Sequence, residues 1–179
     1  MNIVKKVRDV KIGDEDYIMT FDMRSIAVFK ELTGKSFLQS SAKLGLLDDE
    51  IVLGFIGATL RKVNEEDKPL GKQLYDMDIM YLLLNLSEIV IELVTSSLSQ
   101  SKNNDNNIKK VIDEDIDLDF LLYCYTSILN KSENEFWEST PRKIFLQIDI
   151  YNKLNGKEST KDKINNIVQG ETLTLKAVD

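Results

Sequence analysis

The chain has 179 residues, 42% of them hydrophobic and 30% charged, which is typical of a globular protein rather than a disordered one. Its net charge of −7 argues against a nucleic-acid-binding surface, because such surfaces neutralise phosphates with Lys and Arg. With no histidine and one cysteine, Cys124, the chain cannot by itself build a Ser-His-Asp triad, a Cys-His pair or a disulfide. We therefore expect a binding protein and not an enzyme, without cofactor or metal.

The start of the chain, Met1 to Lys6, lacks the apolar run of a signal peptide, which favours the cytoplasm. The most apolar stretch, Ile79 to Leu98, contains Glu88 and Glu92. A membrane span would have to hide these acids, at a cost of about 2.5–3.5 kcal/mol for one near the helix centre. We interpret this stretch as the buried central helix of the domain and expect no membrane partner.

The N-terminal region predicts a β-hairpin. Residues 2–12 and 16–22 are rich in β-branched and aromatic side chains, and they flank a turn at residues 13–16. Tyr17, Met19 and Phe21 share one face of the second strand. The first strand is rich in Lys and Arg, which suits the edge of a sheet.

Helix-capping residues divide the rest of this region. Asp22, Ser36 and Asp48 are expected to start helices, and Gly34 to end the first of them. The third of these helices is expected to carry one apolar stripe made of Val52, Phe55, Ile56, Thr59 and Val63. A charged loop containing Pro69 separates it from the long apolar helix, which starts at Asp76 or Asp78.

Two glycines, Gly54 and Gly57, lie inside the third predicted helix, where each costs about 1 kcal/mol of helix propensity. A closely packed neighbouring helix would explain both. A weak or kinked helix is the alternative, and the sequence does not choose between them.

The second half of the chain follows a polar linker. We predict an α+β fold that is predominantly α-helical: an N-terminal β-hairpin and helical bundle in a body at 1–98, a polar linker at 99–112, a helical hairpin module at 113–156, and a polar tail at 157–179. Thr140-Pro141 is a strong helix start within the module. In the tail, residues 172–176 alternate as a strand would, and we favour a loose tail over addition to the hairpin.

Short motifs give little support for catalysis or for ligand binding. Gly34-Lys35-Ser36 lacks the first glycine of a phosphate-binding loop, because Phe29 stands there. The acidic segment 113–119 lacks the sixth-position glycine of an EF-hand and is expected to be a solvated helix start, at which a basic partner segment could still dock. Glu88 and Glu92 share a helix face and are expected to form its solvent-facing strip.

Phe136-Trp137 and the near-continuous apolar surface of the last predicted helix are the best candidates for contact with a partner, since aromatic residues are enriched at interfaces. For Trp137 alone, a place in the core is the slightly better interpretation. For the module as a whole an interface is favoured, because two helices of this size cannot bury so many apolar side chains against each other. The candidates are Phe120, Tyr123, Phe136, Trp137, Phe145 and Tyr151.

Two segments resemble phage tail assembly chaperones. Residues 24–37 (RSIAVFKELTGKSF) resemble the first helix of those proteins and the residues that end it. Residues 119–152 resemble the helical extension of their long forms, with Glu135-Phe136-Trp137 followed by a helix start at Thr140-Pro141. The order of body, polar linker and helical module also matches.

The resemblance implies a protein of the host bacterial cytoplasm that is not part of the virion. It would bind the tape-measure protein, keep it soluble and deliver it to the tail tube protein, and it could be a homo-oligomer. The phage type, including a prophage or a tail-like bacteriocin, stays open. The alternative is a minor structural tail protein of the virion.

Overall fold

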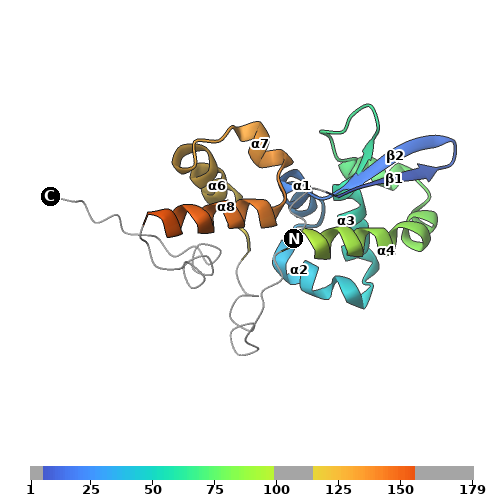
Figure 1. Cartoon of the computed structure of the whole chain (residues 1–179). Coiled ribbons are helices and arrows are strands. Elements are labelled where there is room, and N and C mark those ends of the chain that lie inside the picture. The colour runs from blue at the N-terminus through green and yellow to red at the C-terminus, as the bar shows by residue number, and fades with distance from the viewer. Residues whose placement is uncertain (1–5, 99–114, 156–179) are drawn as a thin grey trace.

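A computed structural model describes residues 6–98 and 115–155. The chain folds as an α+β protein that is mostly helical, in agreement with the sequence prediction. Figure 1 shows a body that contains a small sheet and the helices of the first half, and beside it a group of helices from the second half. The predicted linker and tail, and the strand-like residues 172–176, lie outside the described residues.

Strands and helices follow one another along the described chain in a mixed order. They are β1 (Val7–Ile12), β2 (Glu15–Thr20), α1 (Met23–Thr33), α2 (Phe37–Lys43), η1 (Leu44–Leu46), α3 (Asp49–Thr59), β3 (Leu60–Lys62), η2 (Gly71–Asp76), α4 (Ile79–Ser97), α6 (Leu118–Tyr123), the π-helical turn η3 (Cys124–Ile128), α7 (Glu133–Glu138) and α8 (Pro141–Leu154).

The predicted hairpin is confirmed, with a tighter turn than expected. Ile12 pairs with Glu15, so the turn consists of Gly13 and Asp14 alone. Gly13 has φ 62°, as the first turn residue of a type II′ hairpin requires. The antiparallel sheet has the order β1-β2-β3, and its basic strand β1 lies at an edge, as predicted.

The third strand corrects the predicted end of α3. The helix stops at Thr59, and residues 60–62 pair with β2 instead of continuing the helix. Val63, expected in the buried helical stripe, lies outside the helix and is 43% exposed. Helical periodicity hid this strand because Val63 follows Thr59 at the four-residue spacing of the predicted stripe.

The predicted caps act as helix starts in the structure. The side chains of Asp22, Asp48 and Asp78 each accept a hydrogen bond from a backbone N–H in the first turn of the helix that follows. Gly34 ends α1 in the left-handed conformation, with φ 63°. These local signals fix the helix boundaries because each one satisfies backbone groups that the helix itself leaves unpaired.

Helices α1 and α3 approach each other closely, which decides between the two explanations of Gly54 and Gly57. A Cβ atom at Gly54 would lie 2.5 Å from Thr33 Cγ2, and one at Gly57 would lie 3.0 Å from Leu32 Cδ1. The rings of Phe29 and Phe55 stack across this contact with centroids 4.1 Å apart. Close packing, and not a weak helix, explains both glycines.

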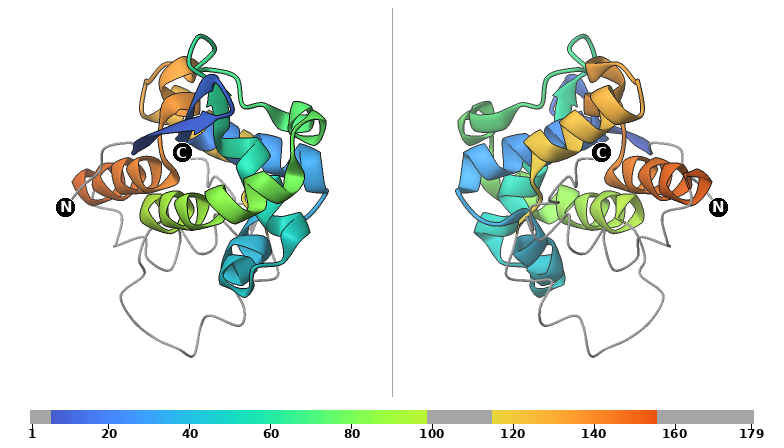
Figure 2. Two further views of the ribbon diagram at one scale, coloured as in Figure 1. Left: turned by 90° about the vertical axis from the view of Figure 1, so that its right-hand side faces the viewer. Right: turned by 90° about the vertical axis from the view of Figure 1, so that its left-hand side faces the viewer.

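Helix α4 corrects a second expectation. It crosses the body beside α3 (Figures 1 and 2) and buries one face, formed by Leu82, Leu86, Val90, Leu93, Val94 and Ser97. Part of its surface is open, since Met80 is 64% and Leu84 76% exposed. Among the described residues it is the one helix long and apolar enough to cross a membrane by length and composition. It is therefore not the enclosed central helix that its composition predicted.

The helices of the second half pack together and then onto α1. Leu121, Tyr125, Phe136 and Ile144 are buried in the same apolar cluster as the core of the body. The chain leaves α6 through the π-helical turn, which ends at Ile128, and Asn130 just after it adopts the left-handed conformation, with φ 53°. Helix α7, whose start Ser132 predicted, then leads to α8.

Candidate partner-binding surface

Polar contacts hold the second-half helices against α1 and α2. The Met23 backbone N–H donates a 3.0 Å hydrogen bond to the Ser139 carbonyl. The Asp115 carboxylate lies 3.1 Å from Lys30 Nζ and accepts a 3.0 Å hydrogen bond from the Phe37 backbone N–H. Asp115 belongs to the acidic segment that was expected to be solvated. Part of that segment therefore caps α2 from within the chain and is not open to a basic partner.

The six residues predicted to contact a partner differ in how exposed their side chains are. Phe136 is fully buried with its ring 5.7 Å from that of Tyr125, so its side chain is not available to a partner in this conformation. Tyr123 is the most open of the six, at 59% exposed. Phe120, Trp137, Phe145 and Tyr151 are half-buried. Among these six residues, a ring contact joins Phe136 to Trp137.

Trp137 lies at the junction with the body. Its indole Nε1 donates a 3.0 Å hydrogen bond to Glu133, and its ring packs edge-on against Phe136. Trp137 also lines an open groove of about 460 Å³ together with Val28 of α1 and Pro69 of the loop after β3. Arg24, Asp67 and Lys68 rim the groove, so it carries charges of both signs.

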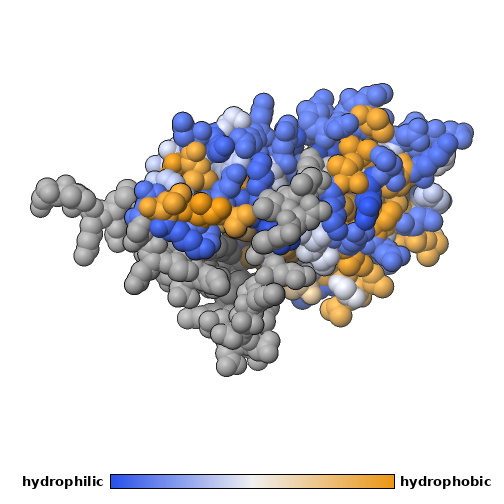
Figure 3. Space-filling model, in the orientation of Figure 1, coloured by the Kyte–Doolittle hydropathy of each residue, from blue (hydrophilic) through white to orange (hydrophobic). Residues whose placement is uncertain are grey.

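Helix α8 presents the most continuous apolar face of the second half. Ile144 and Ile148 are buried toward the other helices, while Ile150 is 47% and Leu154 81% exposed. Figure 3 shows apolar residues along α8 on the side that faces the viewer. Ile150 and Leu154 are four residues apart and so share a helix face. The sequence indicates the apolar surface of this helix as a candidate, but the six residues selected are all aromatic, so Ile150 and Leu154 are not among them.

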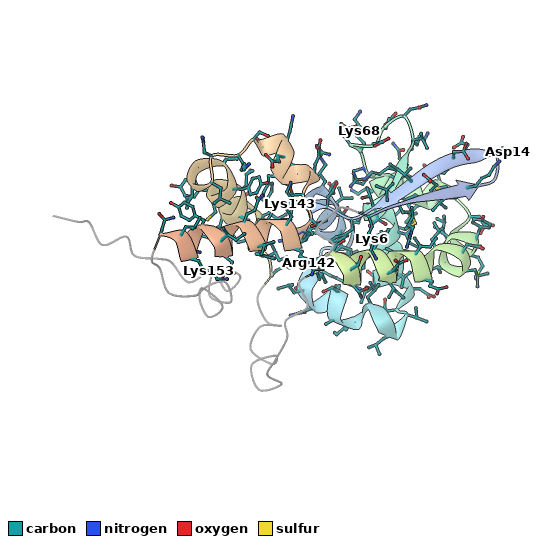
Figure 4. The ribbon with its side chains drawn as sticks, viewed as in Figure 1. Lys6, Asp14, Lys68, Arg142, Lys143 and Lys153 are labelled. Atoms are coloured by element: carbon teal, nitrogen blue, oxygen red, sulfur yellow. The ribbon has the colours of Figure 1, made fainter. Side chains whose placement is uncertain are left out.

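Cations flank this face of α8. Arg142, Lys143 and Lys153 project from the helix (Figure 4). Lys153 pairs with Asp149 at 2.6 Å and Lys143 with Glu135 at 3.5 Å, so much of this positive charge is neutralised by neighbours within the chain. The surface is therefore an apolar helix face with balanced charge, which suits contact with another apolar helix face.

The described residues show few features of a metal-binding or catalytic site. In residues 6–98 and 115–155 no group of His, Cys, Asp and Glu side chains is arranged to hold a metal ion. Cys124 is buried, and burial, followed by the nearby Asp117 carboxylate, raises the pKa of its thiol. A thiol with a raised pKa is a poor nucleophile at neutral pH.

The pair Glu88 and Glu92 is not a catalytic dyad either. Glu88 points into solvent, as predicted. Glu92 accepts hydrogen bonds from Lys6 Nζ at 3.0 Å and from Arg8 Nη2 at 2.7 Å, which ties α4 to β1. Lys6 and then Arg8 lower the pKa of the Glu92 carboxyl, so this acid is a structural anion.

Comparisons of the chain with protein-family models, with curated proteins and with solved structures gave no match. The resemblance to tail assembly chaperones therefore rests on residues 24–37 and 119–152 and on the order of body, polar linker and helical module.

Proposed function

We propose that this chain is a tail assembly chaperone of a phage, prophage or tail-like bacteriocin. It binds the tape-measure protein in the host bacterial cytoplasm, keeps it soluble, and delivers it to the tail tube protein. The proposal describes a binding protein, not an enzyme. It draws on the resemblance of residues 24–37 and 119–152 to that family.

The observation that carries the proposal is the apolar face of α8 that stays open after the second-half helices have packed. Exposed large apolar side chains in rows, such as Ile150 and Leu154, are typical of surfaces that bind another molecule. A tape-measure protein, as the resemblance describes it, is a long helical chain with apolar stripes. Such a stripe can lie along a helix face, and many weak copies along one chain would add up to stable coating.

Co-expression with the neighbouring tape-measure gene product tests this proposal. We expect the tape-measure protein to be soluble with the wild-type chain and to return to the pellet with Ile150→Ser/Leu154→Ser. The matched control is Leu46→Ser, which removes a leucine that is 78% exposed on η1. Equal precipitation with and without the wild-type chain would refute the proposal.

Surface substitutions are a better test than deletion of the helical extension. Tyr125 and Phe136 are fully buried in the common apolar cluster, so a deletion would open the core of the body as well as remove the α8 face. If the deletion variant did not keep the tape-measure protein soluble, that result would reflect misfolding of the body and not only the loss of the α8 face. Ile150→Ser and Leu154→Ser change exposed side chains and leave that core intact.

Mass spectrometry of purified particles separates the chaperone from the alternative function, a minor structural tail protein. A chaperone is expected to be missing from finished particles. Stoichiometric presence of this chain would favour the structural role.

A further inference from the structure

We propose that residues 172–178 (TLTLKAV) add to the open edge of β1 as a fourth, antiparallel strand from the same chain. The added strand closes this edge of the sheet and covers an apolar hollow between the hairpin and the start of α4. It replaces the expectation that this segment is a loose tail. The proposal does not rest on the proposed function.

The outer edge of β1 offers unpaired backbone groups. Ile12 flanks the two-residue turn and bonds to β2, so every second residue back along β1 does the same. The backbone groups of Val7, Asp9 and Lys11 therefore point away from β2. Among these outward groups, only the Lys11 carbonyl has a partner within residues 6–98 and 115–155, the Tyr81 hydroxyl at 3.3 Å, and a carbonyl oxygen can accept a second hydrogen bond. Such an edge pairs readily with another extended segment.

An apolar hollow lies beside this edge. It measures about 410 Å³ and is lined by Ile12, Gly13, Met77, Asp78 and Tyr81. Figure 1 shows the hairpin turn and the start of α4 at the same end of the body. A strand added to β1 would place every second side chain on the face that borders the hollow, because alternate residues of a strand point to the same side.

The leucines of residues 172–178 match that face. In one antiparallel register Leu173 lies opposite Ile12, which lines the hollow. Two residues further on, Leu175 then lies opposite Val10, which packs against the core. Directly opposed apolar side chains stabilise an antiparallel pair, so this register extends the apolar layer under the sheet.

The remaining residues of the segment fit the same register. Lys176 lies opposite Asp9, which is exposed and forms no ion pair with any other residue that the structure describes. Opposite charges across a strand pair are favourable. Ala177, the smallest residue of the segment, lies opposite Arg8 and leaves room for the existing ion pair between Arg8 and Glu92.

The chain is long enough to bring this segment to β1 within one molecule. Residues 156–172 connect α8 to Leu173, and an extended chain of that length spans up to about 60 Å. A globular protein of this size is about 40 Å across. Tethering also raises the local concentration of the segment above that of a second copy at micromolar protein concentrations, which favours the chain's own segment as the occupant.

Disulfide trapping tests the register in the full chain. Asp9→Cys/Lys176→Cys in a Cys124→Ser background places two thiols opposite each other, at a Cα separation of about 5.5 Å that a disulfide accepts. The matched control is Asp9→Cys/Thr172→Cys, whose second thiol lies on the same face but about 13 Å further along the strand. Under mild oxidation we expect the first pair to form an intramolecular disulfide about tenfold faster than the control, as measured by peptide mapping without reduction.

Hydrogen exchange measures the strand pairing itself. In this register the Thr174 N–H points toward Lys11, and proline at position 174 removes that donor. The outward amides of Asp9 and Lys11 should therefore exchange about tenfold or more slowly in wild type than in Thr174→Pro. Thr174→Val keeps the N–H and the β-branched side chain and should exchange like wild type.

Three results would overturn the proposal. The first is a disulfide that forms equally fast in both cysteine pairs, or faster in the control pair as a parallel strand would give. The second is a disulfide between two molecules, which would identify a second copy as the occupant. The third is exchange of the Asp9 and Lys11 amides that is as fast in wild type as in Thr174→Pro. None of these results depends on the tape-measure protein.

Discussion

The guanidinium of Arg61 on β3 donates a 2.7 Å hydrogen bond to the carboxylate of Asp22, and both side chains are fully buried. Asp22 also caps α1 by accepting a hydrogen bond from the Ser25 backbone N–H. Arg61 donates a further hydrogen bond to the Glu66 carbonyl. One buried ion pair therefore fixes the start of α1, the short strand β3 and the loop after it in a single arrangement.

Removing one member of this pair should be strongly destabilising. Arg61→Met removes the guanidinium that donates to the buried Asp22 carboxylate, and we expect a loss of about 3–5 kcal/mol in the free energy of unfolding. Urea denaturation followed by circular dichroism measures it. Lys62→Met, an exposed neighbour on β3, is the control and should stay within about 0.5 kcal/mol of wild type.

The double variant Asp22→Asn/Arg61→Met separates the pair from its parts. Because the two side chains contact each other, its loss should be smaller than the sum of the two single losses. An Arg61→Met chain that unfolds at the wild-type urea concentration would contradict the structural role of the pair.

Gly54→Ala should destabilise the contact between α1 and α3. The new Cβ would meet Thr33 Cγ2 at 2.5 Å and Phe29 Cε2 at 3.0 Å, and we expect a loss of about 1–3 kcal/mol in unfolding free energy despite the better helix propensity of alanine. Gly45→Ala is the control, because no described atom lies within 4 Å of its Cβ position. If Gly54→Ala were as stable as Gly45→Ala, the close approach of the two helices would be wrong.

The ion pairs of Glu92 give stability a defined pH dependence. Lys6 and Arg8 lower the pKa of Glu92 in the folded state below its ordinary value of 4.5, so the folded state binds this proton less readily than the unfolded state. The contribution is therefore present above pH 4.5 and is lost as the pH falls through the lowered pKa.

Glu92→Gln tests this dependence. Thermal melts at falling pH should show a weaker decline in stability for the variant than for wild type, and added salt should shrink the difference because the pair is partly exposed. Glu88→Gln, an exposed acid on the same helix, should follow wild type. Identical acid melts for Glu92→Gln and wild type would rule out the pairing.

The single cysteine reports on the packing of the second-half helices. Cys124 is 6% exposed and burial raises the pKa of its thiol, so labelling by a small aromatic disulfide should be slow in the folded chain and fast in urea. Ser127→Cys in a Cys124→Ser background places the thiol at an exposed position of the same turn and should label rapidly without denaturant. Rapid labelling of native Cys124 would show that these helices are not packed as described.

Local chemistry made much of the fold predictable. Asp22, Asp48 and Asp78 cap helices where expected, and Gly13 and Gly34 adopt the left-handed conformations that a hairpin turn and a helix end require. Each of these signals acts within a few residues, so the sequence alone reveals it.

Features that depend on contacts between residues far apart in the sequence could not be predicted from local signals. Leu60 to Lys62 form a strand because β2 offers a pairing edge, and three residues are too few to show a strand pattern in the sequence. The composition of α4 does not show which of its apolar stripes meets α3. Phe136 and Ile150 are both apolar, and only the packing of three helices buries the first and leaves the second open.

Site-specific crosslinking tests the central claim most directly. A photo-reactive phenylalanine at Ile150 places the reporter on the open face of α8, and one at Leu46 places it on η1 as the control. After irradiation of cells that co-express both proteins, we predict an adduct with the tape-measure protein from position 150 and little from position 46. No adduct from position 150, or equal adducts from both, would contradict the account.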